Sequence, residues 1–258
     1  MEELLKIDCD FVNGALVRFL RENFDNEGFD KGVVGLSGGL DSSVTAFLAA
    51  QALGDKNVTG VLMPYRTSTR DSNDDAMKVV ETLGINHYKI DISPMVDAFF
   101  LNFPDADRVR RGNKMARERM SILYDISKFE RSLVLGTSNK TEIILGYGTL
   151  HGDVASAINP LSDLYKTQIR QLARHIGVPD EIVNKPPSAG LWEGQTDEEE
   201  LGFSYEEVDR YLFLKTDRKY DRDKLLESGF AGDFISRVSE TVKRNEFKGR
   251  GTITRKLF

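Results

Sequence analysis

The residues with the clearest potential for chemistry stand in the segment GVVGLSGGLDSSV, residues 32–44. Its small residues follow an apolar β-rich run and precede a helical pattern, so free backbone NH groups and the helix dipole favour an anion there. Gly38 and Gly39 allow a phosphate to approach the backbone closely, while Ser37 and Ser42 add hydroxyl donors. The segment predicts a phosphate-binding loop, although it matches neither the Walker motif nor GxGxxG.

Asp41 is the informative residue of this loop. A carboxylate beside bound phosphates repels them unless a divalent cation bridges the two, so we expect Mg²⁺ here. The alternative is that the glycines form a tight turn and Asp41 only caps the helix. The six residues SGGLDS resemble the pyrophosphate loop of the N-type ATP pyrophosphatases, which split ATP into AMP and pyrophosphate to activate a carbonyl or carboxyl group.

A second polar group follows the apolar run at 133–135, in the sequence LVLGTSNKTE. Ligands bind beyond the carboxyl ends of the strands in an open parallel sheet, so we expect Thr137 and Glu142 to share a crevice with the phosphate loop. Mg²⁺ usually takes one or two carboxylates with phosphate oxygens and water, so Glu142 can complete the site that Asp41 begins. Alternatively, Thr137 is a turn residue and Glu142 belongs to a capping box.

Several longer segments strongly resemble the ammonia-dependent NAD synthetases, in the order LGTSNKTE, GYGT, INPLSDLYKTQIR and KPPSAGLWEGQTDEEELGFSY. The resemblance extends over about residues 30–250. Members of this family amidate the nicotinate carboxylate of deamido-NAD with ammonia and ATP, through an acyl-adenylate, and release NAD, AMP and pyrophosphate. A glutamine-hydrolysing enzyme needs a further domain with a catalytic cysteine, and Cys9 is the only cysteine here, so we expect free ammonia as the nitrogen donor.

The resemblance assigns residues to the ATP end of the site. It implies that ATP is bound by the first loop and three later positions, namely Gly35, Leu36, Ser37, Gly38, Gly39, Leu40, Asp41, Ser42, Thr137, Lys166 and Ser188. Asp41 and Glu142 are the implied Mg²⁺ ligands. Lys166 is expected to be catalytic by neutralising the departing pyrophosphate; without the resemblance it would be an exposed helix lysine. Ser188 is expected to close over the phosphates and exclude water.

The resemblance also assigns residues to the acceptor substrate. Asp153 matches the carboxylate that holds or deprotonates ammonia, and such a base is needed because ammonium has no lone pair. Arg117 and Lys248 are the implied contacts to deamido-NAD, whose pyrophosphate and carboxylate suit planar, bidentate cations. The other basic residues of the run 108–119 are expected to form a solvated helical face.

Three positions depart from the family pattern. Many members carry lysine, aspartate and histidine where this chain has Leu150, Ala157 and Phe247. Two alternatives therefore stay open, namely an ATP-pyrophosphatase amidoligase with another carboxylate substrate, and a non-catalytic nucleotide-binding module. The second is disfavoured by the joint presence of the four charged residues Asp41, Glu142, Asp153 and Lys166.

The elements that position these residues follow an alternating pattern. Apolar runs at 33–36, 58–63, 88–90 and 133–135 predict buried strands. Helical patterns lie at 3–23, 41–53, 72–83, 94–102, 108–127, 165–176, 204–214 and 231–245. Alternation predicts a doubly wound parallel α/β sheet, and the resemblance implies the adenine-nucleotide alpha-hydrolase-like kind, with a helical C-terminal part. We expect one domain over 1–258, and a long surface loop at 186–202 whose acidic run, 197–200, starts a solvated helix.

Composition narrows the class of protein. The chain has 258 residues and a net charge of −6, and its pI of about 5.3 argues against nucleic-acid binding. It has no apolar run of the ~18 residues that a membrane span needs, and no signal-peptide pattern. A lone cysteine points to a reducing compartment, so we expect a cytoplasmic protein. The resemblance further implies a homodimer with deamido-NAD at the subunit interface.

Overall fold

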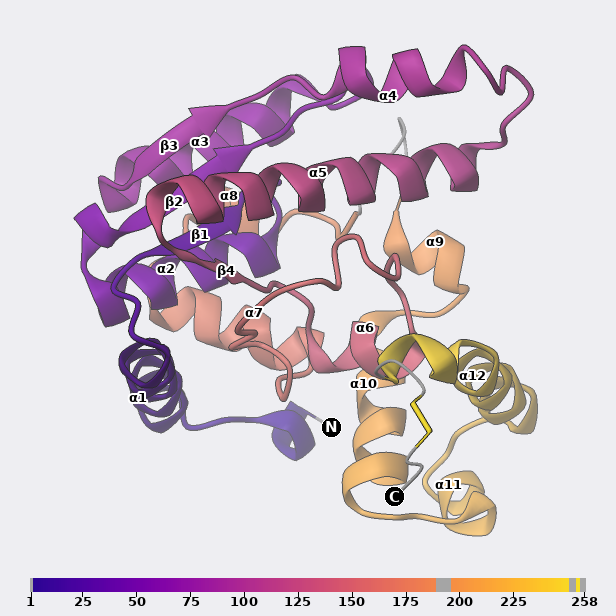
Figure 1. The fold of residues 1–258 in the computed structure, drawn as a ribbon. Helices are drawn as coiled ribbons and strands as arrows, with labels where there is room; N and C mark the ends of the chain where they lie inside the picture. The colour runs from indigo at the N-terminus through magenta and orange to yellow at the C-terminus, as the bar shows by residue number, and fades with distance from the viewer. Residues whose placement is uncertain (1, 189–195, 251–253, 256–258) are drawn as a thin grey trace.

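The structure is a computed structural model that describes residues 2–188, 196–250 and 254–255. Within these residues the sheet has four strands, all parallel, in the order β3-β2-β1-β4. Their bounds are Gly32–Gly35 for β1, Val58–Leu62 for β2, Asn86–Lys89 for β3 and Leu133–Leu135 for β4. The chain builds the sheet outward from β1 to β3, and then returns to place β4 on the other side of β1 (Figure 1).

Helices connect the strands and continue beyond the sheet. In chain order they are α1 (Cys9–Glu27), α2 (Leu40–Leu53), α3 (Arg70–Leu83), α4 (Ser93–Phe100), α5 (Arg108–Glu130), α6 (Lys140–Leu145), α7 (Lys166–His175), α8 (Asp180–Val183), α9 (Asp197–Leu201), α10 (Tyr205–Leu212), α11 (Arg222–Glu227) and α12 (Gly232–Asn245). Short 3-10 turns lie at Glu2–Leu5, Asp55–Asn57 and Glu246–Gly249, and a π-helical turn, Phe213–Asp217, continues α10. No helix among the described residues has both the length and the apolar character needed to cross a bilayer.

Apolar side chains of the strands alternate between two cores, one on each face of the sheet. Val34 packs in the core formed with α1, α2, α3 and α7, whereas Val33 packs in the core formed with α4 and α5. Both valines are fully buried, as expected for a parallel strand covered on both faces. Figure 1 shows α5 and α4 on one side of the sheet and α2, α7 and α1 on the other. The predicted doubly wound α/β fold is confirmed.

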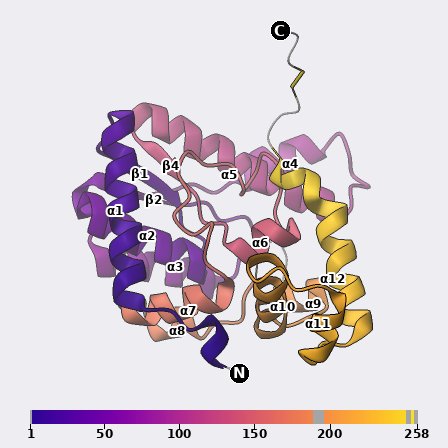
Figure 2. The same cartoon turned by 90° about the horizontal axis from the view of Figure 1, so that it is seen from below.

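The predicted helical C-terminal part is present as well. Figure 2 shows α10, α11 and α12 gathered beside α6, around a third core rich in aromatic side chains. Tyr211 contacts Phe230 and Phe234 edge to face, with ring centroids 5.6 Å apart in each pair, a geometry that adds to the stabilisation from burial. Leu145, the last residue of α6, and Tyr165, the residue before α7, belong to this core, so the C-terminal helices support the end of α6 and the start of α7.

Two predicted elements differ from the structure. The sequence predicts a buried strand at 88–90, but β3 begins at Asn86 and all four of its residues are exposed. β3 is an edge strand, paired on one side with β2, and a β-rich run does not reveal where its strand lies in a sheet. The first helix, predicted from residue 3, begins at Cys9 because the Asp8 carboxylate caps it, accepting a hydrogen bond from the Phe11 amide at 3.1 Å.

Candidate active site

The main cavity opens where β1 and β4 lie side by side. The connection from β1 to β2 runs through α2 on one face of the sheet, and the connection into β4 runs through α5 on the other face. The strand order reverses at this point, which is where ligands bind in open α/β sheets. The cavity has a volume of about 690 Å³ and is lined by the loop after β1, the ends of β2 and β4, one side of α5 and the first turns of α3, α6 and α7. It is large enough for a nucleotide.

Nearly all the predicted site residues line this cavity. They are the whole loop 35–42 together with Thr137, Glu142, Asp153, Lys166, Ser188 and Lys248. Arg117 does not line it: the side chain is exposed on α5, and its Nε donates to the Leu150 carbonyl at 3.2 Å. The three positions that depart from the family pattern, Leu150, Ala157 and Phe247, also lie outside the lining. Of the predicted surface loop, residues 189–195 lie outside the described part of the chain.

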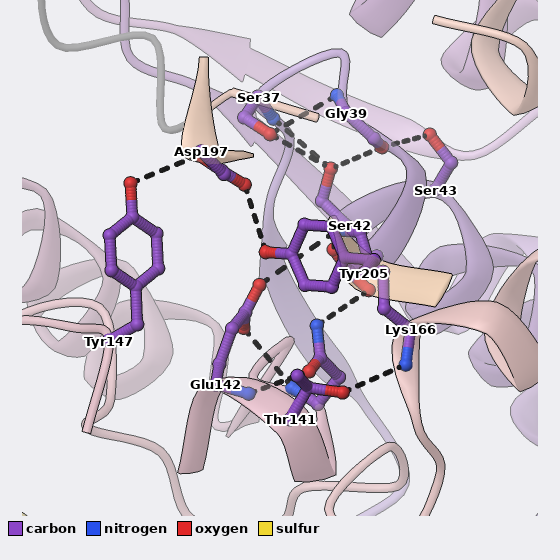
Figure 3. A network of polar contacts seen from close by, with 12 residues as sticks. Ser37, Gly39, Ser42, Ser43, Thr141, Glu142, Tyr147, Lys166, Asp197 and Tyr205 are labelled. Atoms are coloured by element: carbon purple, nitrogen blue, oxygen red, sulfur yellow. Dashed lines mark hydrogen bonds and ion pairs between the residues drawn. The ribbon is translucent and has the colours of Figure 1, made fainter. Parts of the chain in front are cut away.

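The phosphate loop is held in shape by its own serines (Figure 3). The Ser42 and Ser43 hydroxyls donate to the Gly39 carbonyl at 3.1 and 2.8 Å, and Ser37 Oγ accepts from the Gly39 amide at 3.2 Å. Gly38 has a φ of +77°, and a Cβ there would lie 2.1 Å from the Ser72 carbonyl oxygen of α3. Only glycine therefore fits this contact between the loop and α3.

Lys166, Asp41 and Glu142 form a buried charged cluster where α7, α2 and α6 begin. The Lys166 ammonium forms an ion pair with Asp41 Oδ2 and lies 3.8 Å from Glu142 Oε1. Burial alone would lower the pKa of Lys166, but the charges of Asp41 and Glu142 outweigh burial and raise it. Lys166 is only 4% exposed, so its ammonium is a fixed charge at the phosphate loop and not a mobile surface group.

Asn139 links the two carboxylates of the cluster. Its side-chain oxygen accepts a hydrogen bond from the Glu142 backbone amide at 2.9 Å, and its own backbone amide donates to Glu142 Oε2 at 3.2 Å. Its side-chain nitrogen also donates to Asp41 Oδ1 at 3.4 Å. The predicted capping box is thus present, and the same geometry turns Glu142 toward Asp41. The two interpretations of Glu142 from the sequence, helix cap and metal ligand, are compatible.

The donor set at Asp41 and Glu142 fits Mg²⁺. Burial and the nearby Asp41 carboxylate raise the pKa of Glu142 well above its usual value, which is the signature of negative charge that a cation would stabilise. Among the described residues, no group of three or more metal-binding side chains of the His, Cys, Asp and Glu types is present. At nucleotide sites, Mg²⁺ is usually bound by one or two carboxylates, and phosphate oxygens and water complete its coordination.

Asp197 belongs to the same site, contrary to the prediction that the run 197–200 is solvated. It is 4% exposed and lies 3.1 Å from both the Tyr147 and the Tyr205 hydroxyl, which point at it in Figure 3. Burial raises its pKa, against the opposing charge of Lys166. The prediction is wrong here because Tyr147 is fifty positions away along the chain, and a local charge pattern carries no information about such a partner.

Asp209 of α10 is a second carboxylate that sequence reasoning misses. Fully buried, it accepts hydrogen bonds from the Thr141 hydroxyl at 2.5 Å and the Thr167 amide at 2.8 Å. The Thr141 oxygen in turn accepts from the Lys166 amide at 3.1 Å. Asp209 therefore ties together the first turns of α6 and α7, which carry Glu142 and Lys166.

Asp153 also lines the cavity. Its Oδ1 accepts from the Thr149 amide at 2.8 Å, and the Lys248 ammonium nearby donates to the carbonyls of Gly146 and Gly148 at 2.8 and 3.0 Å. Asp153 is open to the cavity, yet the protein packed around it raises the pKa of its carboxyl by dehydration, against the opposing charge of Lys248. A carboxylate with a raised pKa accepts a proton more readily than an ordinary aspartate, as a general base requires.

The base of the long loop is attached to the cavity wall. Lys185 donates to Asp75 Oδ2 at 2.6 Å and to the Ser72 hydroxyl at 3.3 Å, both on α3. Ser72 is also the residue whose carbonyl abuts Gly38. The loop base, α3 and the phosphate loop are therefore in continuous contact.

The fold and site define the class of the protein. A doubly wound parallel sheet with a glycine- and serine-rich loop at the point where connection direction reverses is the adenine-nucleotide alpha-hydrolase-like arrangement. The NAD synthase family model matches residues 12–252. The chain belongs to the NAD synthase family.

Individual relatives support this assignment. An NH(3)-dependent NAD(+) synthetase from Chlorobaculum parvum is 51% identical over 253 residues, which covers 98% of this chain and 91% of the relative. The structure of an NMN synthetase from Francisella tularensis superimposes with a TM-score of 0.87 at 33% identity, covering 97% of this chain and 99% of that one. An NH3-dependent NAD synthetase from Campylobacter jejuni, in complex with the nitrate ion, gives a TM-score of 0.84 at 33% identity, with 97% and 100% covered.

Proposed function

We propose that the protein is an ammonia-dependent NAD synthetase, a carbon–nitrogen ligase. It amidates deamido-NAD with ammonia and ATP, and produces NAD, AMP and pyrophosphate through an acyl-adenylate. One observation carries the proposal: a single cavity joins the charged cluster of Asp41, Glu142 and Lys166 at a phosphate loop to the Asp153 carboxylate, whose pKa is raised. Activation of a carboxylate by ATP needs the first group, and attack by ammonia needs the second.

The ATP end of the cavity positions the nucleotide. Residues 35–42, Thr137 and Ser188 line the wall that receives its phosphates, and the amides at the start of α2 favour their negative charge. Asp41 and Glu142 are the residues that would hold Mg²⁺, which supplies charge neutralisation at the phosphate oxygens. Lys166, held at the same point by Asp209 through Thr141, places a fixed positive charge beside the departing pyrophosphate.

The chemistry needs no covalent bond to the protein. An oxygen of the nicotinate carboxylate attacks the α-phosphorus of ATP, and the bond to pyrophosphate breaks. Ammonia then attacks the acyl carbon of the adenylate, and AMP leaves. Asp153 accepts the proton that the nitrogen must lose. Because its pKa is raised, the Asp153 carboxylate is a stronger base than an ordinary aspartate.

A second candidate substrate is the mononucleotide counterpart of deamido-NAD. The neighbour from Francisella tularensis is named an NMN synthetase, and its structure superimposes over 97% of this chain. In the chain itself, Leu150, Ala157 and Phe247 replace polar residues that the family resemblance links to dinucleotide binding. Such a site would amidate nicotinate mononucleotide and yield NMN by the same two steps.

One experiment separates these functions. Purified protein is incubated with Mg²⁺-ATP and ammonium, and with deamido-NAD, nicotinate mononucleotide or neither, while AMP, pyrophosphate and pyridine nucleotides are followed by chromatography. NAD formed one-to-one with AMP, at a higher kcat/KM than NMN, supports the NAD synthetase assignment. Preferential NMN formation would establish the second candidate, and AMP release with neither acceptor would overturn both.

The homodimer belongs to the same proposal, and an exposed apolar surface supports it. Leu101, Val109 and Phe99, at the junction of α4 and α5, are 82%, 59% and 42% exposed. Basic side chains of the run 108–119 border this surface, because the Arg110 and Arg111 guanidinium groups lie over the Phe103 and Phe100 rings at 4.4 and 4.5 Å. Exposed apolar surface of this kind is typical of subunit contacts.

Light scattering tests the dimer. The wild-type protein should have twice the mass of the chain, and Leu101→Asp should shift it toward the monomer. A monomeric wild type would overturn the proposal.

We also propose a cytoplasmic location, on the basis of the lone cysteine and the absence of a membrane-spanning helix in the described residues.

A further inference from the structure

Arg119 is a cation of the active-site cavity to which neither the sequence motifs nor the family resemblance gives a role. It lies on the same side of α5 as Asn113, Ala116, Met120 and Leu123, all of which line the cavity. Its Nε donates to the carbonyl of Met63, at the end of β2, at 3.0 Å. This anchor leaves the two terminal nitrogens of the guanidinium for another partner.

Three other cations of the cavity wall form ion pairs with carboxylates, whereas Arg119 and Lys248 form none with a described residue. Lys166 pairs with Asp41, Lys185 with Asp75 and Arg170 with Glu206. Among the described residues, no carboxylate lies within ion-pair distance of the Arg119 guanidinium. Burial lowers the pKa of Arg119 to about 10, and the charge of Asp153 opposes this. Arg119 therefore remains charged at neutral pH although the protein surrounds it.

A partly dehydrated guanidinium with two unused donors is a site for a planar anion. Three apolar residues beside it on α5, Ala116, Met120 and Leu123, also line the cavity. Apolar side chains beside a planar cation suit an aromatic carboxylate better than a hydrated phosphate.

We infer that Arg119 binds the carboxylate of the aromatic acid that the enzyme activates, next to Asp153. The inference rests on the proposed function, and it holds for either candidate substrate, because both carry the nicotinate carboxylate. One carboxylate oxygen attacks the α-phosphorus, while the other stays hydrogen-bonded to Arg119. When ammonia attacks, that second oxygen becomes the oxyanion, and the guanidinium stabilises its charge until AMP leaves.

Arg119 would then make the site bind the acid substrate more tightly than the amide product. Deamido-NAD and NAD differ only in the carboxylate, so the ratio of their dissociation constants isolates this contact. In Arg119→Gln the preference for deamido-NAD over NAD should fall by about 10- to 100-fold, as expected for the loss of charge-assisted hydrogen bonds. Arg119→Lys keeps the charge but loses the planar pair of donors. Its preference for deamido-NAD over NAD should therefore lie between those of the wild type and Arg119→Gln.

Calorimetry measures both dissociation constants and the assay above measures KM for ATP, with Lys128→Gln as the matched control. Lys128 is exposed on the same helix, and its loss should leave the preference unchanged. An intact preference in Arg119→Gln, or a rise in KM for ATP alone, would overturn the inference while leaving the proposed function in place. Wild-type protein that forms neither NAD nor NMN would instead overturn the proposed function, and this inference with it.

The wild-type protein gives a test that does not depend on the folding of a variant. Nitrogen-15 NMR of arginine side chains should show the Arg119 guanidinium signal moving on addition of deamido-NAD, and much less on addition of NAD. Equal responses to the two ligands would contradict the inference.

Discussion

The Lys166 ammonium and the Asp41 carboxylate, 125 positions apart in the chain, form an ion pair between the first turns of α7 and α2. A divalent cation held by Asp41 would share this carboxylate with the Lys166 ammonium. We therefore expect lysine and metal to compete for it.

Lys166→Met should separate metal binding from catalysis. Without the competing ammonium, Asp41 and Glu142 should bind Mg²⁺ more tightly in the absence of ATP, as measured by calorimetry. Turnover should nevertheless fall by about 10²- to 10³-fold, because the fixed charge beside the departing pyrophosphate is lost. Lys185→Met, which removes a lysine paired with Asp75, serves as the control and should leave Mg²⁺ affinity unchanged. Weaker Mg²⁺ binding in Lys166→Met would contradict the competition.

Asp41→Asn should lower kcat/KM by at least about 10²- to 10³-fold, since a preorganised charge at the phosphate loop is removed. The amide has nearly the same shape and the fold should persist, as judged by circular dichroism. Near-normal turnover in this variant would be incompatible with the assigned role of Asp41 in metal binding.

The pH dependence of metal binding should reflect Glu142. Burial and Asp41 raise its pKa above the usual value of 4.5, and only the ionised carboxylate binds Mg²⁺. The Mg²⁺ concentration for half-maximal activity should therefore increase as the pH is lowered, beginning at a higher pH than an ordinary glutamate would give. In Glu142→Gln this acid-side increase should disappear. A metal requirement that varies with pH equally in both proteins would rule out Glu142 as its source.

Asp209 should make stability depend on pH. Burial raises its pKa from 3.8 to about 6 in the folded protein, so the folded state binds this proton more tightly than the unfolded state does. The resulting stabilisation is complete below about pH 4 and disappears as the pH rises through about 6, a change of about 3 kcal/mol. Relative to Asp209→Asn, the wild type should lose most of that unfolding free energy between pH 4 and 7 in urea titrations. A constant difference would show that the carboxyl titrates normally.

Gly38→Ala should disturb both stability and nucleotide binding. The added Cβ would meet the Ser72 carbonyl and sit at a positive φ, which should cost about 1–3 kcal/mol in thermal unfolding and raise KM for ATP. Gly14→Ala is the matched control: nothing lies within 4 Å of its added Cβ, and alanine within α1 should stabilise by about 0.5–1 kcal/mol. A Gly38 variant as stable as the Gly14 variant would refute the close contact.

Much of the site is visible in the sequence because its residues stand next to one another. The loop 35–42 and the pair Thr137 and Glu142 each follow a strand directly, and strand order then brings them together. The role of Lys166, in contrast, depends on the family resemblance, because the helical pattern that contains it would suit an exposed lysine equally well.

Partners set by distant packing are the part that sequence reasoning misses. Asp197 is buried by Tyr147 and Tyr205, and Asp209 by residues at the starts of α6 and α7; neither contact leaves a periodic signal. Arg119, in contrast, does follow a periodic pattern. Ala116, Arg119 and Met120 all lie on the cavity side of α5, whereas Arg117 does not. Applying the helical period to residues 108–127 would have distinguished the two arginines.

The position of β4 beside β1 determines when the sheet can be completed during translation. Gly32 of β1 pairs with Val58 of β2 on one side and with Leu133 of β4 on the other, so one edge of β1 stays unpaired until β4 has been synthesised. At about 5–20 residues per second, the 125 residues between Asp41 and Lys166 represent about 6 to 25 s of translation. The phosphate loop and Lys166 therefore meet only late in synthesis, so nucleotide contacts that need both of them form after α7 has emerged.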